Sequence, residues 1–233
     1  MSMHVLSGLS GAALGLLAGP LVGRLALQVP ADVPVWSTGW WRADPAGRRR
    51  RVLITAVAAV VLGLLAGALG PQPALPAYLW LGVAGVALAV IDLDHHRLPD
   101  VLTLPTYGVG LVLLGVAAAT DGDGARYLRA LLAMTAVFAA FFVLAFLGGV
   151  GFGDTKLAGV LGLYLGWIGW DTVLLGLVAG FVVGAAVAVV LLIRRLAGWR
   201  TDFAFGPALL LGALVAVVSG GPIVDAYVSG VAG

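Results

Sequence analysis

The 233-residue sequence contains no cysteine, no glutamate and a single lysine, Lys156. The absence of cysteine excludes disulfide bonds, a thiol nucleophile and any zinc or iron–sulfur site built on thiolates. Charged residues make up only 10% of the chain, against roughly a quarter in an ordinary globular domain. A soluble globular protein is thereby excluded, as are disordered and coiled-coil chains. The small net charge of +2 comes with no basic face on a polar domain, which argues against nucleic-acid binding.

Long apolar stretches make up most of the sequence. Seven stretches lack Asp, Lys and Arg: 5–23, 52–91, 101–120, 130–153, 157–170, 172–193 and 203–224. A membrane helix needs about 20 residues, so 52–91 holds two helices, separated at Gly70-Pro71-Gln72-Pro73, where proline forces a turn. The sequence therefore predicts an all-α, polytopic integral membrane protein with about eight transmembrane helices, in a single membrane domain over 1–233. The run 157–170 is the shortest and could only re-enter the bilayer.

The distribution of basic residues predicts the orientation. With the N-terminus outside, eleven of the thirteen Lys and Arg residues fall in inner loops, and only Arg126 and Arg129 lie outside. If 157–170 failed to span, the arginines beyond residue 193 would be moved outside, so we count it as a span. The first apolar run lacks a basic residue before it and is followed by Arg24, which indicates a retained helix rather than a secretory signal.

The one long inner loop, 24–51, ends in four arginines, Arg48–Arg51, and carries three tryptophans: Trp36, Trp40 and Trp41. We interpret it as a topology determinant with interfacial aromatic anchors, with binding of anionic lipid or a partner as the alternative. The first helix is rich in glycine over 8–23, which favours close helix packing.

Two clusters of ionisable residues lie at helix ends on the same, inner side of the membrane. The first spans 91–100, between the third and fourth helices, and the second spans 151–156, between the fifth and sixth. Ionisable groups at membrane helices are costly and therefore candidates for function. Asp100, after Pro99, also suits the positive end of the fourth helix, and Asp154 could be only an N-cap.

Adjacent histidines follow the first acidic pair. His95 and His96 on a wet inner loop are most simply solvated. A metal site would need them together with Asp92 and Asp94, but neighbouring side chains point apart. We therefore expect no metal here.

Asp92 and Asp154 together suit the hydrolysis of a peptide bond. Two carboxylates held close share a proton, which provides one base to activate water and one acid to protonate the departing nitrogen. Gly151 and Gly153 lack a Cβ, so that a substrate backbone can approach the carboxylate closely. Two alternatives remain open: a transporter or channel that uses these aspartates for cations or protons, and an inactive assembly protein that holds them apart.

Both clusters resemble motifs of the type IV prepilin peptidases. Asp92-Leu-Asp-His-His-Arg-Leu-Pro99-Asp100 is similar to the first catalytic motif, Gly151-Phe-Gly-Asp154-Thr-Lys156 to the GxGD motif, and Phe205-Gly206-Pro207 to a further segment. The resemblance is close over 77–225 and looser in the first helix. It implies an aspartic endopeptidase of the plasma membrane, with Asp92 and Asp154 catalytic on the cytoplasmic side. Asp94 and Asp100 fall on other motif positions, and Lys156 lies beside the pair.

The resemblance also implies the substrate and bears on cofactors. The expected partners are the lipid bilayer and a prepilin or pseudopilin, whose short basic leader precedes a hydrophobic helix. Proteolysis needs no cofactor. Many bacterial members also methylate the new N-terminus with S-adenosylmethionine and bind zinc through cysteines in the first inner loop. Loop 24–51 has no cysteine, so the zinc site is absent and methyltransferase activity stays an open question.

Overall fold

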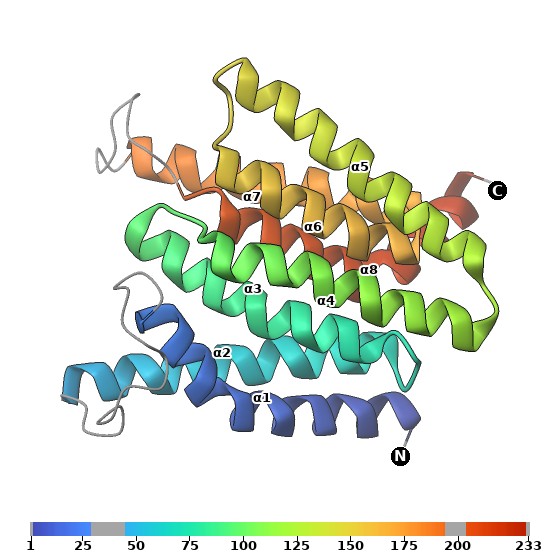
Figure 1. Cartoon of the computed structure of the whole chain (residues 1–233), viewed down its shortest axis with the longest axis horizontal. Coiled ribbons are helices and arrows are strands. Elements are labelled where there is room, and N and C mark those ends of the chain that lie inside the picture. The colour runs from blue at the N-terminus through green and yellow to red at the C-terminus, as the bar shows by residue number, and fades with distance from the viewer. Residues whose placement is uncertain (1, 29–44, 194–203, 232–233) are drawn as a thin grey trace. The chain divides into compact units, whose positions relative to one another are not determined.

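The computed structural model describes residues 2–28, 45–193 and 204–231 of the chain (Figure 1). Within these ranges all regular structure is helical. The chain forms two compact units, Met1–Asp121 and Gly122–Gly233. The helices are α1 (Met3–Gln28), α2 (Pro45–Leu69), α3 (Leu75–His95), α4 (Asp100–Asp121), α5 (Gly124–Phe146), α6 (Phe152–Ile168), α7 (Trp170–Ile193) and α8 (Gly206–Val231).

The predicted all-α polytopic class is confirmed. Among the described residues, six helices, α1 to α5 and α7, are long and apolar enough to cross a membrane. The break in the run 52–91 is also confirmed: α2 ends at Leu69, Gly70 takes a left-handed φ of 68° and α3 begins at Leu75. The predicted run 157–170 lies in α6, which has only 17 residues. In α8, the segment Gly206–Ser219 is apolar but shorter than a full span.

In the first unit, α1 and α2 pack with their backbones in contact. Gly11, Gly15 and Gly19 recur every fourth residue along one face of α1. A Cβ at Gly15 would lie 2.4 Å from Cα of Ala59, and one at Gly11 would lie 2.5 Å from the carbonyl oxygen of Leu62. No larger residue fits at these positions. The close packing predicted from the glycines of the first helix is therefore confirmed.

The third helix joins this pair through a small apolar core. Val22 of α1, Ile54 and Ala58 of α2, and Val86 and Ala87 of α3 are all buried together. Leu102 of α4 packs against the same cluster. The core fixes α3 against the glycine-packed pair and α4 against α3, and so positions the chain segment that joins α3 to α4.

In the second unit, α6 is the enclosed helix. It packs against α5, α7 and α8, and every residue from Leu157 to Trp167 is buried. Glycine again sets the spacing, because a Cβ at Gly166 would lie 2.4 Å from Cβ of Ala133 in α5. The pair α7 and α8 is equally close: a Cβ at Gly212 would lie 2.3 Å from the backbone nitrogen of Gly180.

Two predicted boundaries are wrong. The loop 24–51 is shorter than expected, because α1 continues to Gln28 and α2 begins at Pro45, so Arg24 and Arg48–Arg51 are helical. Its tryptophans Trp36, Trp40 and Trp41, together with Arg42, lie outside the described residues, as do Arg194, Arg195 and Arg200.

The fifth helix is displaced from the predicted run 130–153. It covers Gly124–Phe146, because the Asp123 side chain caps it by accepting a hydrogen bond from the backbone N–H of Arg126 at 2.9 Å. Arg126 and Arg129, expected in an outer loop, therefore lie in its first turns.

Candidate active site

Asp92 lies in the last turn of α3 and is only 4% exposed. The helix ends sharply at His95, because His96 takes a left-handed conformation with φ of 51° and its N–H donates to the backbone carbonyl of Asp92 at 2.8 Å. The chain turns away at this point. The Asp92 side chain is thereby held at a fixed helix end, among the few buried polar groups of the described residues.

The neighbouring Asp94 is engaged in an ion pair. Its carboxylate accepts from the guanidinium of Arg50 in α2, and both side chains are partly exposed. His95 and His96 are exposed. Among the residues with described positions, no three His, Asp or Glu side chains come together in an arrangement that could hold a metal.

Asp100 is the first residue of α4, as the structural interpretation of Pro99-Asp100 predicts. A carboxylate in the first turn complements the partial positive charge of the helix N-terminus. Thr103 is fully buried, and its hydroxyl donates to the carbonyl of Pro99 at 3.1 Å. Two interactions therefore stabilise the start of α4: the charge of Asp100 and the hydrogen bond from Thr103 to Pro99.

Asp154 lies in the first turn of α6 and is half-buried. The prediction that it could be the N-cap is wrong: the N-cap is Gly151, in an extended conformation with ψ of 151°. A Cβ at Gly151 would lie 3.3 Å from Oδ2 of Asp154. Glycine therefore leaves space beside this carboxylate that any other residue would occupy. Gly153, between the two, is partly exposed.

Thr155 ties the start of α6 to α5. It is 1% exposed, and its hydroxyl lies within hydrogen-bond distance of the carbonyl oxygens of Phe141 (3.3 Å) and Gly151 (3.1 Å). Lys156, the next residue, is half-buried. Sequence reasoning gave Thr155 no role, although a hydroxyl between two charged residues in an apolar helix was the available signal.

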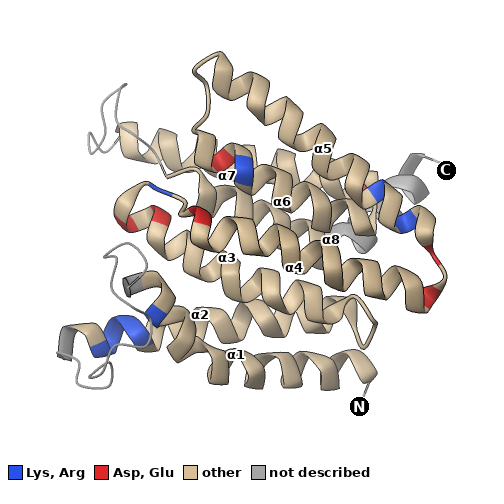
Figure 2. Ribbon diagram, in the orientation of Figure 1, with Lys and Arg blue, Asp and Glu red and all other residues tan. Residues whose placement is uncertain are grey.

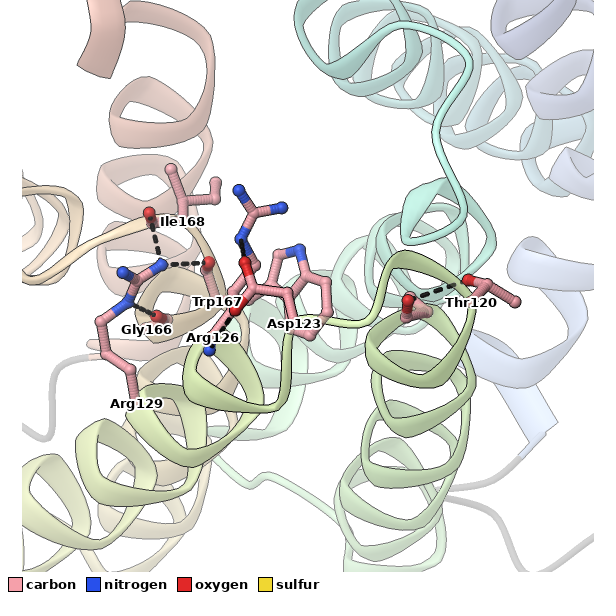
Figure 3. A network of polar contacts seen from close by, with 8 residues as sticks. Thr120, Asp123, Arg126, Arg129, Gly166, Trp167 and Ile168 are labelled. Carbon is pink, nitrogen blue, oxygen red and sulfur yellow. Dashed lines mark hydrogen bonds and ion pairs between the residues drawn. The ribbon is translucent and has the colours of Figure 1, made fainter.

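Arg129 holds the opposite end of α6 (Figure 3). Its guanidinium donates to three carbonyl oxygens of the last turn, those of Gly166 (2.8 Å), Trp167 (2.7 Å) and Ile168 (2.9 Å). These carbonyls have no partner within the helix, and a cation also suits the negative helix end. The axial position of α6, and with it that of Asp154, is therefore fixed from both ends.

Exposed aromatic rings adjoin the start of α6. Phe142 of α5 meets the edge of Phe152 with ring centroids 6.1 Å apart, and Phe138 stacks on Phe142 at the same separation. Phe152, two residues before Asp154, is 62% exposed. The three rings form an apolar surface leading to the second motif.

Each motif thus has its own supports within its own unit. Figure 2 shows that the charged residues, in blue and red, gather at helix ends, whereas the middle stretches of the described helices are tan. Asp92, Asp94 and Asp100 belong to the unit that ends at Asp121, whereas Gly151, Gly153, Asp154 and Lys156 belong to the unit that begins at Gly122. The meeting of Asp92 with Asp154 stays a prediction.

Comparison with known proteins identifies relatives that match most of this chain. The model of the type IV leader peptidase family matches residues 77–189. Proteins named prepilin leader peptidase/N-methyltransferase are similar to the chain: 32% identity to that of Pseudomonas aeruginosa, over 77% of this chain and 61% of the relative, and 30% to that of Aeromonas hydrophila, over 85% and 70%. A third, from Burkholderia pseudomallei, is 32% identical over 84% and 65%. The chain therefore spans only part of their length. No solved structure gives a significant match.

Proposed function

Since this chain belongs to the type IV leader peptidase family, we propose that it is a membrane aspartic endopeptidase that cleaves the basic leader from type IV prepilins or pseudopilins. The proposal rests on one observation: each unit has an aspartate at a helix end. Asp92 lies in the last turn of α3, and Asp154 lies in the first turn of α6.

Connectivity supports placing both carboxylates on one membrane side. Between the end of α3 and the start of α6 the chain forms α4 and α5, each long and apolar enough to cross the bilayer. Two crossings return the chain to the side from which it left. With the N-terminus outside, that side is the cytoplasmic face of the plasma membrane, where the basic residues gather.

The two helix ends favour a division of labour. Peptide N–H groups at the start of α6 stabilise negative charge on Asp154, whereas Asp92 lies near the carbonyl groups at the end of α3. We assign Asp154 as the base and Asp92 as the acid. Water loses a proton to Asp154 and its oxygen bonds to the scissile carbonyl carbon, while Asp92 gives a proton to the amide nitrogen. The C–N bond then breaks into an acid and a free amine, and proton exchange resets the pair.

The surroundings suit the proposed substrate. Asp100, which is exposed at the start of α4, adds negative charge near the first motif and favours a basic leader, whereas the charge of Asp94 is balanced by Arg50. The exposed rings of Phe142 and Phe152 beside Asp154 offer an apolar surface to the hydrophobic helix that follows the leader. A transporter or channel, the alternative interpretation, has no support among the relatives, whose names are those of peptidases.

The proposal is restricted to peptide-bond cleavage. The relatives' names include a second activity, N-methylation, for which S-adenosylmethionine would be the methyl donor. A cysteine-based zinc site does not fit this chain, which has no cysteine. Mass spectrometry of the processed pilin would detect any methyl group on its new N-terminus.

Cleavage of a co-expressed prepilin tests the proposal. Asp92→Asn and Asp154→Asn should each abolish processing while the protein stays at normal abundance in the membrane. The double variant should be no worse than either single one, because the pair acts as a unit. Asp121→Asn, at the other end of α4 and exposed, is the matched control and should process normally. Full processing by either of the first two variants would refute the pair.

A further inference from the structure

We propose that α1 and α2 form a binding site for one anionic phospholipid, with its phosphate held by Arg48 and Arg51 and an acyl chain along the groove below them. The groove has a volume of about 380 Å³. Its apolar lining includes Leu16 and Pro20 of α1 and Val52 and Ala56 of α2. This inference is independent of the proposed hydrolysis.

The groove runs beside the last glycine contact between the two helices, because its lining includes Thr55. A Cβ at Gly19 would lie 2.7 Å from Cα of Thr55, so the backbones are in contact there. One turn later, a Cβ at Gly23 would meet only Cγ of Arg51, at the ordinary distance of 3.6 Å. Pro20 lies between these two glycines, where its ring has no N–H to donate. The helices therefore leave room beside α2 at the level of its arginines.

The two arginines of the groove suit a phosphate. Arg48 and Arg51 are three residues apart on α2 and so share one face. The Arg51 Nε donates to the carbonyl of Gly47 at 3.3 Å, which orients its guanidinium. Guanidinium groups bind phosphate oxygens through paired hydrogen bonds. Arg50 is paired with Asp94 and does not line the groove.

The apolar part of the groove identifies the ligand as a lipid rather than a soluble phosphate. Leu16 and Val52 are 57% and 61% exposed, and both belong to helices apolar enough to lie in a bilayer. An acyl chain would cover them, whereas inorganic or glycerol phosphate would not. Two positive charges at the mouth repel a basic leader peptide and attract the anionic headgroups of a cytoplasmic leaflet.

Titration of the purified full chain in neutral detergent tests the site. Dioleoyl-phosphatidylglycerol should raise the melting temperature with saturation, whereas dioleoyl-phosphatidylcholine and glycerol phosphate should not. Arg48→Gln should weaken the apparent affinity for phosphatidylglycerol about fivefold, as expected for one interfacial arginine. Ala56→Trp, which fills the groove without changing charge, should abolish the saturable shift. Arg49→Gln removes the same charge outside the groove lining and should bind as the wild type does.

Each other outcome overturns the site. An equal loss of affinity for phosphatidylglycerol in Arg49→Gln and Arg48→Gln would mean that the helix attracts any anionic surface without a specific site. A shift with glycerol phosphate as large as that with the lipid would mean a phosphate site without an acyl chain. If Ala56→Trp bound the lipid as tightly as the wild type, the groove would not be part of the binding site. Arg51→Gln is not needed for these comparisons, so a loss of folding through its Gly47 contact would not affect them.

Discussion

The two motif helices, α3 and α6, carry the same functional group on opposite helix ends. Asp92 closes α3 and is buried, whereas Asp154 opens α6 and is half-buried. Support for α3 comes through its neighbours in the apolar core and through the Arg50–Asp94 ion pair near its end. Support for α6 comes from hydrogen bonds at both ends, from Thr155 and Arg129. Identical residues can therefore be placed in different electrostatic surroundings without any change of side chain.

Among the changes that compare the two helices, the largest expected effect comes from lengthening each carboxylate by one methylene. Asp92→Glu should lower prepilin cleavage by about 100-fold, the effect of a displacement of about 1 Å in a catalytic group, because a buried side chain cannot adjust. Asp154→Glu, in a half-open position, should retain more activity, with a loss of about 10-fold. The measurement is the initial rate of leader removal in detergent. The reverse order would contradict the difference in burial.

The space beside Asp154 is the next target. Gly151→Ala should lower cleavage by about 10-fold, because its Cβ would lie 3.3 Å from Oδ2 of Asp154 and displace the carboxylate or the substrate. Gly149→Ala is the matched control on the same turn, since its Cβ would meet only the carbonyl of Leu144, at 3.4 Å. Equal losses in the two variants would show that the turn, rather than the carboxylate, is affected.

Stability should depend on the far end of α6. Arg129→Gln leaves carbonyls of the last turn without their donor and should lower the free energy of unfolding by about 2–4 kcal/mol. An SDS-titration unfolding assay measures this. Arg126→Gln, which loses a half-exposed pair with Asp123 and a ring contact with Trp167, should cost less than about 1 kcal/mol. A similar loss of unfolding free energy in the two variants would contradict a special role of Arg129 in stabilising the end of α6.

The smallest effect is expected at the Arg50–Asp94 pair. Asp94→Asn should change the free energy of unfolding by less than about 1 kcal/mol, because the partly exposed pair is screened by water and salt. A double-mutant cycle with Arg50→Gln isolates the interaction, and its coupling energy should fall as salt is raised. A large, salt-independent coupling would show that this pair supports α3 as strongly as Arg129 supports α6.

Much of the fold follows from the sequence. Charge-free runs of about 20 residues predict helices, and Gly70 with its neighbouring prolines predicts the break between α2 and α3. The start of α5 was predicted wrongly because a charge-free criterion discards Arg126 and Arg129, although Asp123 is an N-cap signal. A membrane helix can begin in charged turns when those side chains face water or carbonyls.

The site was only partly predictable. Both motif aspartates lie at helix ends as expected, but α6 begins earlier than an N-cap at Asp154 predicts, because the extended Gly151 is the N-cap. The Arg50–Asp94 pair joins residues 44 apart, and Arg129 reaches carbonyls 37 to 39 residues away. Neither contact leaves a local pattern, because each depends on the register between neighbouring helices.

That register sets a depth for the second carboxylate. Thr155 is level with Phe141, yet α5 continues to Phe146, five residues or about 7 Å further. Asp154 therefore lies below the end of the neighbouring helix, α5. If Asp154 acts as proposed above, the cleaved bond must pass the end of α5 to reach it.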